Sequence, residues 1–209
     1  MEEVIYNPVI AEAYFSETAS REIHVLLSRA PESGSDPAAQ IKVTDGDGKE
    51  YAVASADSED GRAILLTMEE ALELSKAYDI SMEGYEGTTV SMNKIIGSSY
   101  FDEAFTYDGR DLGATYTKEK TGFKVWAPTA SEVTLNLYEQ GDGDNLTETL
   151  PMTMGEKGVW SCEKQGDLNG VYYTYSIKIG TRTNEAVDLY ARTTGVNGNR
   201  GMVVDLRAT

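Results

Sequence analysis

The sequence predicts an all-β protein made of two small β-sandwich domains of immunoglobulin-like type in tandem. Apolar and polar residues alternate over short segments, which is the pattern of strands with one buried face. Turns that contain glycine separate these segments, as is typical of a sandwich. The charge and the glycine content both change near the middle of the 209 residues, which indicates two domains with a modest core each.

We place the domain boundary before Tyr107. Residues 1–106 contain 21 acidic and 7 basic side chains, whereas residues 107–209 contain 14 acidic and 11 basic ones. Glycine rises from 7 residues in the first part to 13 in the second, and both tryptophans, Trp126 and Trp160, lie in the second part. The predicted domains are an N-terminal accessory β-sandwich, residues 1–106, and a second β-sandwich, residues 107–209.

The first domain has the less regular strand pattern. A hairpin turn is expected at residues 46–48, Gly-Asp-Gly, and an exposed loop at residues 32–37, which are rich in Ser, Gly, Asp and Pro. Thr67 and Glu70 have the spacing of a capping box, so the apolar residues up to Leu74 predict one or two helical turns. The strand candidates are residues 23–27, 40–43, 51–53, 64–66, 78–82 and 88–92.

The second domain alternates clearly with a period of two. Phe123 and Val125 belong to a strand that Pro128 closes. A turn at residues 155–158, Gly-Glu-Lys-Gly, separates the strand segments 150–154 and 159–162. The apolar faces of two further strands consist of Val133, Leu135 and Leu137, and of Val171, Tyr173, Tyr175, Ile177 and Ile179.

The net charge of −17 and the pI of about 4.4 argue against nucleic acid or an anionic membrane as a partner. No apolar run approaches the ~20 residues that a membrane-spanning helix needs. The first ten residues, MEEVIYNPVI, are acidic and lack the apolar core of a secretory signal. We therefore expect a cytoplasmic chain, and a secreted parent protein stays open.

The sequence contains too few residues of the types that bind metals or act as catalytic nucleophiles. Cys162 is the only cysteine and His24 the only histidine, so a disulfide, a zinc site and a Ser-His-Asp triad all lack partners. Residues 45–48 and 142–145 space carboxylates as calcium loops do, but neither is followed by the glutamate of an EF-hand, and hairpin turns explain both. We expect no metal, no cofactor and no catalytic residue.

Aromatic side chains are the candidates for sugar binding, because a ring on a sheet face can stack against a sugar. Trp126 lies within an apolar strand, which is more typical of a core residue. Trp160 follows a turn, where a core position and an exposed position fit equally well. Tyr172 has the opposite parity to the apolar face of its strand, so we expect its ring to be exposed. The candidate stacking residues are Trp160 and Tyr172.

Four motifs mark the second domain: YDGRDLGATYTKEKTGFKVWAPTASEVTLNLY at 107–138, GVYYTY at 170–175, EAVDLYA at 185–191 and GVNGNRGMVVDL at 195–206. The FKVWAPTA core at 123–130 is shared with branching enzymes and isoamylases. The order and spacing of all four resemble the family 48 carbohydrate-binding module of type I pullulanases. The first domain resembles only loosely the small N-terminal domain that precedes this module in short pullulanases.

The resemblance implies an α-1,6-glucan debranching enzyme of glycoside hydrolase family 13, which acts with retention on a (β/α)₈ barrel. A barrel needs ~250 residues, and the Tyr-Asn-Trp-Gly-Tyr-Asp-Pro signature and catalytic Asp and Glu segments of that family are absent from these 209 residues. We therefore expect this chain to be inactive alone.

The sequence departs from the family pattern at several positions. Leu189 stands where relatives often have proline in an Asp-Pro-Tyr-Ala motif. Thr174 stands where glycogen-sensing modules have a sugar-binding lysine, and residues 180–183 lack the tryptophan of the following turn. The first domain has no tryptophan and does not match the family 41 module of other pullulanases. The main sugar-binding platform of the family is thus expected to be absent.

Two functions follow from the resemblance. In the first, both domains pack against the catalytic barrel of the same protein and border its substrate cleft. In the second, the module binds α-glucan such as pullulan, glycogen or starch, which would raise the local concentration of polymer. A self-contained interaction protein is the remaining alternative. The docking residues of the first hypothesis, which lie just before the missing barrel, are Asp188, Tyr190, Asn197, Gly198, Gly201 and Met202.

Overall fold

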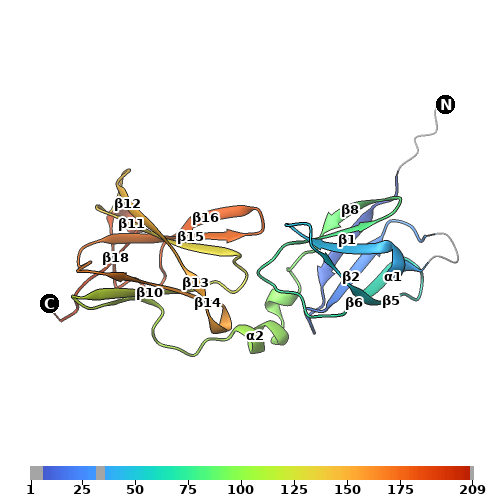
Figure 1. Ribbon diagram of the computed structural model, residues 1–209, viewed down its shortest axis with the longest axis horizontal. Coiled ribbons are helices and arrows are strands. Elements are labelled where there is room, and N and C mark those ends of the chain that lie inside the picture. Colours follow the sequence, from blue (N-terminus) through green and yellow to red (C-terminus); the bar gives the residue numbers. More distant parts are fainter. Residues whose placement is uncertain (1–6, 32–35, 208–209) are drawn as a thin grey trace. The chain divides into compact units, whose positions relative to one another are not determined.

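The computed structural model describes residues 7–31 and 36–207. It divides into two compact units, Met1–Ala104 and Phe105–Thr209. Each unit consists mainly of antiparallel strands (Figure 1), so the predicted all-β class with tandem sandwiches is confirmed. Most of the loop expected at 32–37 lies outside the described residues. Among the helices of the described part, none has the length and apolarity needed to cross a bilayer.

The first unit contains two four-stranded sheets. One sheet has the order β1 (Ile10–Phe15), β2 (Glu22–Leu27), β6 (Ala63–Met68), β5 (Val53–Asp57), and the other has the order β4 (Glu50–Tyr51), β3 (Ile41–Asp45), β7 (Tyr78–Met82), β8 (Tyr85–Thr89). The alternation of residue types builds the core directly, because in β7 Tyr78, Ile80 and Met82 are buried while the residues between them are exposed.

The helical turns expected after Thr67 are wrong. Thr67 and Met68 are the last residues of β6, where they pair with β5, and the chain then continues irregularly to β7. Leu72 and Leu74 are buried in this irregular segment, so they fill the core without a helix. Tertiary burial of a few leucines outweighs a weak local helix signal. The helices of the described residues are instead α1 (Pro37–Gln40) and η1 (Ile95–Gly97) in this unit, α2 (Ser99–Phe105), which ends on the first residue of the second unit, and the short turns η2 (Glu156–Gly158) and η3 (Val196–Gly198) in the second unit.

The second unit also contains two sheets. One has the order β13 (Thr153–Met154), β14 (Val159–Gln165), β10 (Lys120–Trp126), β9 (Gly113–Tyr116); the other has the order β12 (Leu146–Pro151), β11 (Glu132–Tyr138), β15 (Tyr172–Ile179), β18 (Gly201–Met202), β17 (Thr193–Thr194), with β16 (Arg182–Ala186) also paired to β15. The core lies between their apolar faces and includes Phe123, Val133, Leu135, Leu137, Trp160, Tyr173 and Tyr175.

Candidate functional site

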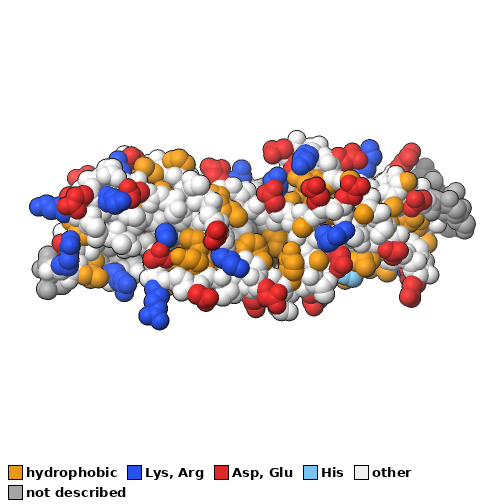
Figure 2. Space-filling view, turned by 60° about the horizontal axis from the view of Figure 1, so that its bottom comes forward, with side chains coloured by type: hydrophobic (Ala, Val, Ile, Leu, Met, Phe, Trp, Pro, Cys, Tyr) orange, Lys and Arg blue, Asp and Glu red, His pale blue; other side chains and the backbone are white. Residues whose placement is uncertain are grey.

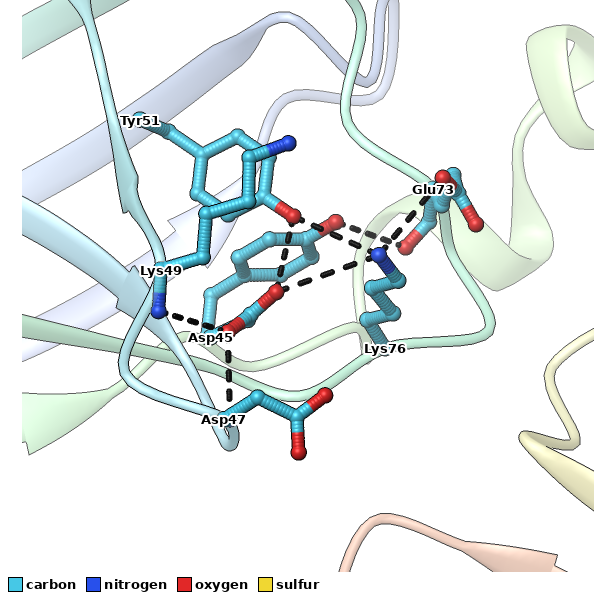
Figure 3. A network of polar contacts seen from close by, with 7 residues as sticks. Asp45, Asp47, Lys49, Tyr51, Glu73 and Lys76 are labelled. Carbon is cyan, nitrogen blue, oxygen red and sulfur yellow. Dashed lines mark hydrogen bonds and ion pairs between the residues drawn. The ribbon is translucent and has the colours of Figure 1, made fainter.

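Asp45 organises a polar cluster at the turn between β3 and β4 (Figure 3). Its carboxylate accepts hydrogen bonds from the backbone N–H groups of Asp47 (3.1 Å) and Lys49 (3.0 Å) and from the Tyr51 hydroxyl (2.8 Å). Lys76 forms an ion pair with it at 3.8 Å. The Tyr51 hydroxyl and the two backbone donors hold the pKa of Asp45 below its ordinary value. The acidic motif at 45–48 is therefore a hairpin turn whose carboxylate is engaged by protein donors.

We expect Asp45→Asn to lower the stability of the first unit at neutral pH. A carboxyl whose pKa falls on folding contributes stability above its unfolded pKa, here near 3.8, and loses it as the pH falls through the lower folded value. Urea unfolding of both proteins should show a gap that is constant above about pH 5 and shrinks below about pH 4. Asp47→Asn, an exposed carboxylate in the same turn, is the matched control. A gap independent of pH would contradict this role.

The second acidic loop, residues 142–145, is held by Arg200. The guanidinium donates to the backbone oxygens of Gln140 (2.7 Å) and Gly143 (2.6 Å) and to the Asn145 side-chain oxygen (2.9 Å). It also lies 3.5 Å from the centre of the Tyr138 ring. Arginine thus engages three oxygens of this loop, and the described residues contain no group of three or more His, Cys, Asp or Glu that could hold a metal.

The outer face of the β11–β15 sheet carries a closed polar network. Asn136 donates to Thr174 (3.3 Å) and Ser176 (2.8 Å), while the Glu185 carboxylate accepts from the hydroxyls of Thr174 and Tyr138. These two hydroxyl donors lower the pKa of Glu185. Thr174, for which the family resemblance suggested the place of a sugar-binding lysine, is buried with its hydroxyl already used. This face therefore offers few free polar groups to a sugar.

The expected stacking role of Trp160 does not fit its position. The side chain is 7% exposed, belongs to the core and donates from its indole nitrogen to the Ala127 oxygen at 3.0 Å. Trp160 pairs with Val125 on β10, and both side chains belong to or pack against the core between the two sheets. Tyr172 is half-buried, and its ring lies next to Gly141 and Gly195, whose backbones approach each other closely. Of the two candidates, only Tyr172 reaches solvent.

Four of the residues expected to dock lie in the C-terminal strands and their turn. Asn197 and Gly198 belong to the 3₁₀ turn η3 (Val196–Gly198), where both have positive φ, and they are exposed. Gly201 and Met202 form β18 beside β15. Gly201 is buried, and a Cβ there would lie 3.0 Å from the Tyr173 ring. Gly201 and Met202 thus have a role within the unit itself, and the docking role of all four residues stays a prediction.

The remaining two residues, Asp188 and Tyr190, border a groove of about 500 Å³. Its lining also includes Tyr107 and Trp126 from the motif at 107–138, and Leu189 from the motif at 185–191. Leu189 is 95% exposed, Tyr190 55% and Trp126 42%, so a mostly apolar surface faces the solvent. An exposed apolar patch of this kind typically marks an interaction site.

The core interpretation of Trp126 is wrong for a simple reason. In β10, Thr121 and Phe123 are buried and Val125 packs against the same core, so Lys124 and Trp126 point to the opposite face. The indole nitrogen donates to the Phe105 oxygen at 2.9 Å, which fixes the ring at the groove. The signal that could have found this residue is the strand's own alternation, which its apolar neighbours masked.

Two buried polar groups lie at the groove beneath these exposed side chains. The Asp188 carboxylate accepts from the Tyr173 hydroxyl (2.7 Å) and from the Tyr190 backbone N–H (2.8 Å). Tyr175, which also lines the groove, is 1% exposed, and its hydroxyl has no hydrogen-bond partner. Burial raises the pKa of Tyr173 and of Tyr175, so both hydroxyls keep their protons. Sequence reasoning assigned Tyr175 to the core and gave no sign of its unused hydroxyl.

The remaining reactive side chains do not form a site. Burial raises the pKa of the Cys162 thiol to about 11, which keeps it protonated and a poor nucleophile. His24 lies in β2 with its ring stacked on Tyr14 at 5.1 Å. Figure 2 shows acidic side chains spread over the visible face without a continuous basic patch.

Comparison with known proteins identifies the second unit. Residues 111–191 match the family model of carbohydrate-binding module 48, the isoamylase N-terminal domain. The second unit contains a family 48 carbohydrate-binding module. This match includes the Trp126 and Asp188 segments and the polar sheet face around Thr174.

Pullulanases are among the proteins similar to this chain. The Bacillus subtilis pullulanase is 38% identical over 117 residues, which are 56% of this chain and 16% of that protein. Chloroplastic pullulanase 1 of Arabidopsis thaliana is 34% identical over 111 residues, which are 50% of this chain and 11% of that protein. The structure of the Anoxybacillus pullulanase complexed with maltotetraose matches 95% of this chain with a TM-score of 0.73 and 33% identity, and this covers 27% of that enzyme. A Paenibacillus barengoltzii pullulanase complexed with maltotriose is 46% identical over 54% of this chain and 17% of its own, with a TM-score of 0.52.

The chain spans about a sixth or less of the curated pullulanases named above. In sequence and fold it corresponds to their N-terminal, non-catalytic region with its carbohydrate-binding module. The match to the Anoxybacillus enzyme extends over both units, which supports the looser resemblance of residues 1–106 as well.

Proposed function

We propose that this chain is the accessory region of an α-1,6-glucan debranching enzyme and that its second unit packs against the catalytic barrel at the border of the substrate cleft. The observation that carries this proposal is the exposed apolar groove formed by Trp126, Leu189 and Tyr190. Exposing a leucine to 95% beside two half-exposed aromatic rings costs free energy in water, and burial of this surface against a partner would remove that cost.

The alternative is that the module itself holds α-glucan. It is supported by the family match and by the maltotetraose and maltotriose in the pullulanase structures similar to this chain. The half-buried Tyr172 would then supply the stacking ring. Against it stand the core position of Trp160 and the closed hydrogen-bond network around Thr174.

The docking proposal predicts that Leu189→Glu weakens association with the barrel by at least about tenfold, because a carboxylate would be buried in an apolar contact. Isothermal titration of this chain with the separately produced catalytic barrel of its parent enzyme measures the effect. Leu146→Glu is the matched control, since Leu146 is 51% exposed on β12 and does not line the groove. No binding of the unmodified chain, or equal binding of both variants, would sink the docking proposal.

Native affinity electrophoresis tests the alternative. If docking is the function, mobility of this chain in gels with pullulan or glycogen should equal its mobility in plain gels, relative to a protein that does not bind glucan. Clear retardation that Tyr172→Ala abolishes would instead establish the module as a glucan-binding site. Retardation that survives Tyr172→Ala would direct the search for the sugar site elsewhere on the chain.

A further inference from the structure

The groove beside Trp126 has an apolar wall and a polar floor. Leu189, Tyr190 and Trp126 supply exposed apolar surface, whereas Asp188 and Tyr175 are buried polar residues of the same lining. Two features of this floor are unusual for a protein interior. The carboxylate of Asp188 has no ion pair with a cation of the described residues, and the hydroxyl of Tyr175 has no hydrogen bond.

Only the first of these features calls for a donor from outside the unit, because the Tyr175 hydroxyl keeps its own proton and its oxygen is fully buried. A buried carboxylate is normally paired with a cation, and a buried hydroxyl is normally hydrogen-bonded. Asp188 uses one acceptor direction on each oxygen, for Tyr173 and for the Tyr190 backbone, and a carboxylate has about four such directions in all. The floor therefore retains acceptor capacity at Asp188.

The walls match an arginine side chain. A guanidinium presents five donors in a planar fork, which would serve the free acceptor directions of the Asp188 carboxylate. Its plane and its aliphatic stem pack well against aromatic rings such as those of Trp126 and Tyr190. One arginine side chain in this groove would therefore stack on the rings and form an ion pair with Asp188 at the same time.

A sugar fits this groove less well. The Trp126 indole nitrogen already donates to the Phe105 oxygen, so the ring retains no donor for a hydroxyl group. Leu189 is an aliphatic side chain with nothing to offer a sugar hydroxyl, and the buried floor presents a negative charge that a neutral glucan does not compensate. Apolar walls above an unpaired anion favour a protein side chain.

We propose that an arginine side chain of the catalytic barrel enters this groove and forms an ion pair with Asp188. This inference rests on the proposed packing of the second unit against the barrel and names the chemistry of the contact. The guanidinium replaces the missing cation of Asp188, while Leu189 and Tyr190 exclude water around the pair.

The test uses small probes on the full 209-residue chain and observes the indole N–H resonance of Trp126 by NMR, assigned by its loss in Trp126→Phe. N-acetyl-arginine amide should shift this resonance at millimolar concentration. Its dissociation constant should be at least about fivefold lower than that of the uncharged N-acetyl-citrulline amide at matched ionic strength. Asp188→Asn should remove the difference between the two probes, because an amide keeps the size of the side chain and loses its charge.

Tyr175→Phe is the matched control for Asp188→Asn. Removing an unpartnered buried hydroxyl should leave the stability of the chain unchanged or raised, and it should leave the affinity for the arginine probe unchanged, because the probe does not reach this atom. A loss of probe affinity in this variant at unchanged stability would overturn the assignment of the contact to Asp188.

Three further outcomes overturn the inference: no response to the arginine probe, an equal response to arginine and citrulline, or a stronger response to maltotriose, which would make the groove a sugar site. The titration with the barrel distinguishes this failure from failure of the docking proposal. If Leu189→Glu abolishes barrel binding but Asp188→Asn leaves its affinity and its salt dependence unchanged, docking stands and the arginine contact does not. If the unmodified chain does not bind the barrel, the proposed function fails with it.

Discussion

Replacing Trp160 by alanine is expected to destabilise the second unit by about 3–5 kcal/mol, in the range of large aromatic residues removed from a core. The ring is 7% exposed and packs in the cluster that includes Phe123 and Tyr173. The substitution leaves a cavity between the two sheets and also leaves the Ala127 oxygen without its indole donor. Such a loss is comparable to the whole stability of a small domain.

Trp126→Ala is the matched control, since both tryptophans lie on the neighbouring strands β10 and β14. Trp126 is 42% exposed, so its removal should cost only about 1–2 kcal/mol, from partial burial and one hydrogen bond. Urea unfolding followed by circular dichroism measures both variants. If Trp160→Ala were as stable as the parent chain and had lost glucan retardation, the ring would be a binding platform and the core position would be refuted.

Gly113→Ala is expected to destabilise the second unit and to disturb the groove at the same time. Gly113 has φ +94°, a left-handed conformation that costs an alanine about 1–2 kcal/mol. A Cβ there would lie 2.9 Å from the Cβ of Tyr190 and 3.3 Å from a carboxylate oxygen of Asp188, which adds about 1–3 kcal/mol of overpacking. This glycine of the YDGRDLGA motif is therefore required by the segment that carries Asp188 and Tyr190.

Gly170→Ala isolates the backbone part of that effect. Gly170 has φ +87° and nothing within 4 Å of its would-be Cβ, so it should cost only about 1–2 kcal/mol. The difference between the two variants in urea unfolding measures the contact with Tyr190. Gly113→Ala should also weaken binding of the arginine probe, whereas Gly170→Ala should not. Equal losses of stability for both variants would show that the close approach to Tyr190 is easily relieved.

Strands with strict alternation were predictable from sequence. The segment 78–82 is β7 without change, and the apolar face of residues 171–179 is the buried face of β15 at Tyr173 and Tyr175. The weak elements were not predictable, because their signals are local and tertiary contacts override them. Thr67 and Glu70 have the spacing of a capping box, but Thr67 lies at the end of a strand and Glu70 in the bend that follows. The strand β1 (Ile10–Phe15) was missed altogether.

Residue types and their spacing were sufficient for the all-β class and for the resemblance to the family 48 module, because period-two burial and motif order are properties of the linear chain. The site was decided by tertiary structure alone. Trp126, Tyr175 and Asp188 come from three strands or loops, and only the packing of the two sheets brings them to one groove. Trp160 is buried and Trp126 is exposed because the fold packs other residues against the first ring and only partly against the second. The lack of a partner for the Tyr175 hydroxyl likewise depends on all the residues that the fold brings around it.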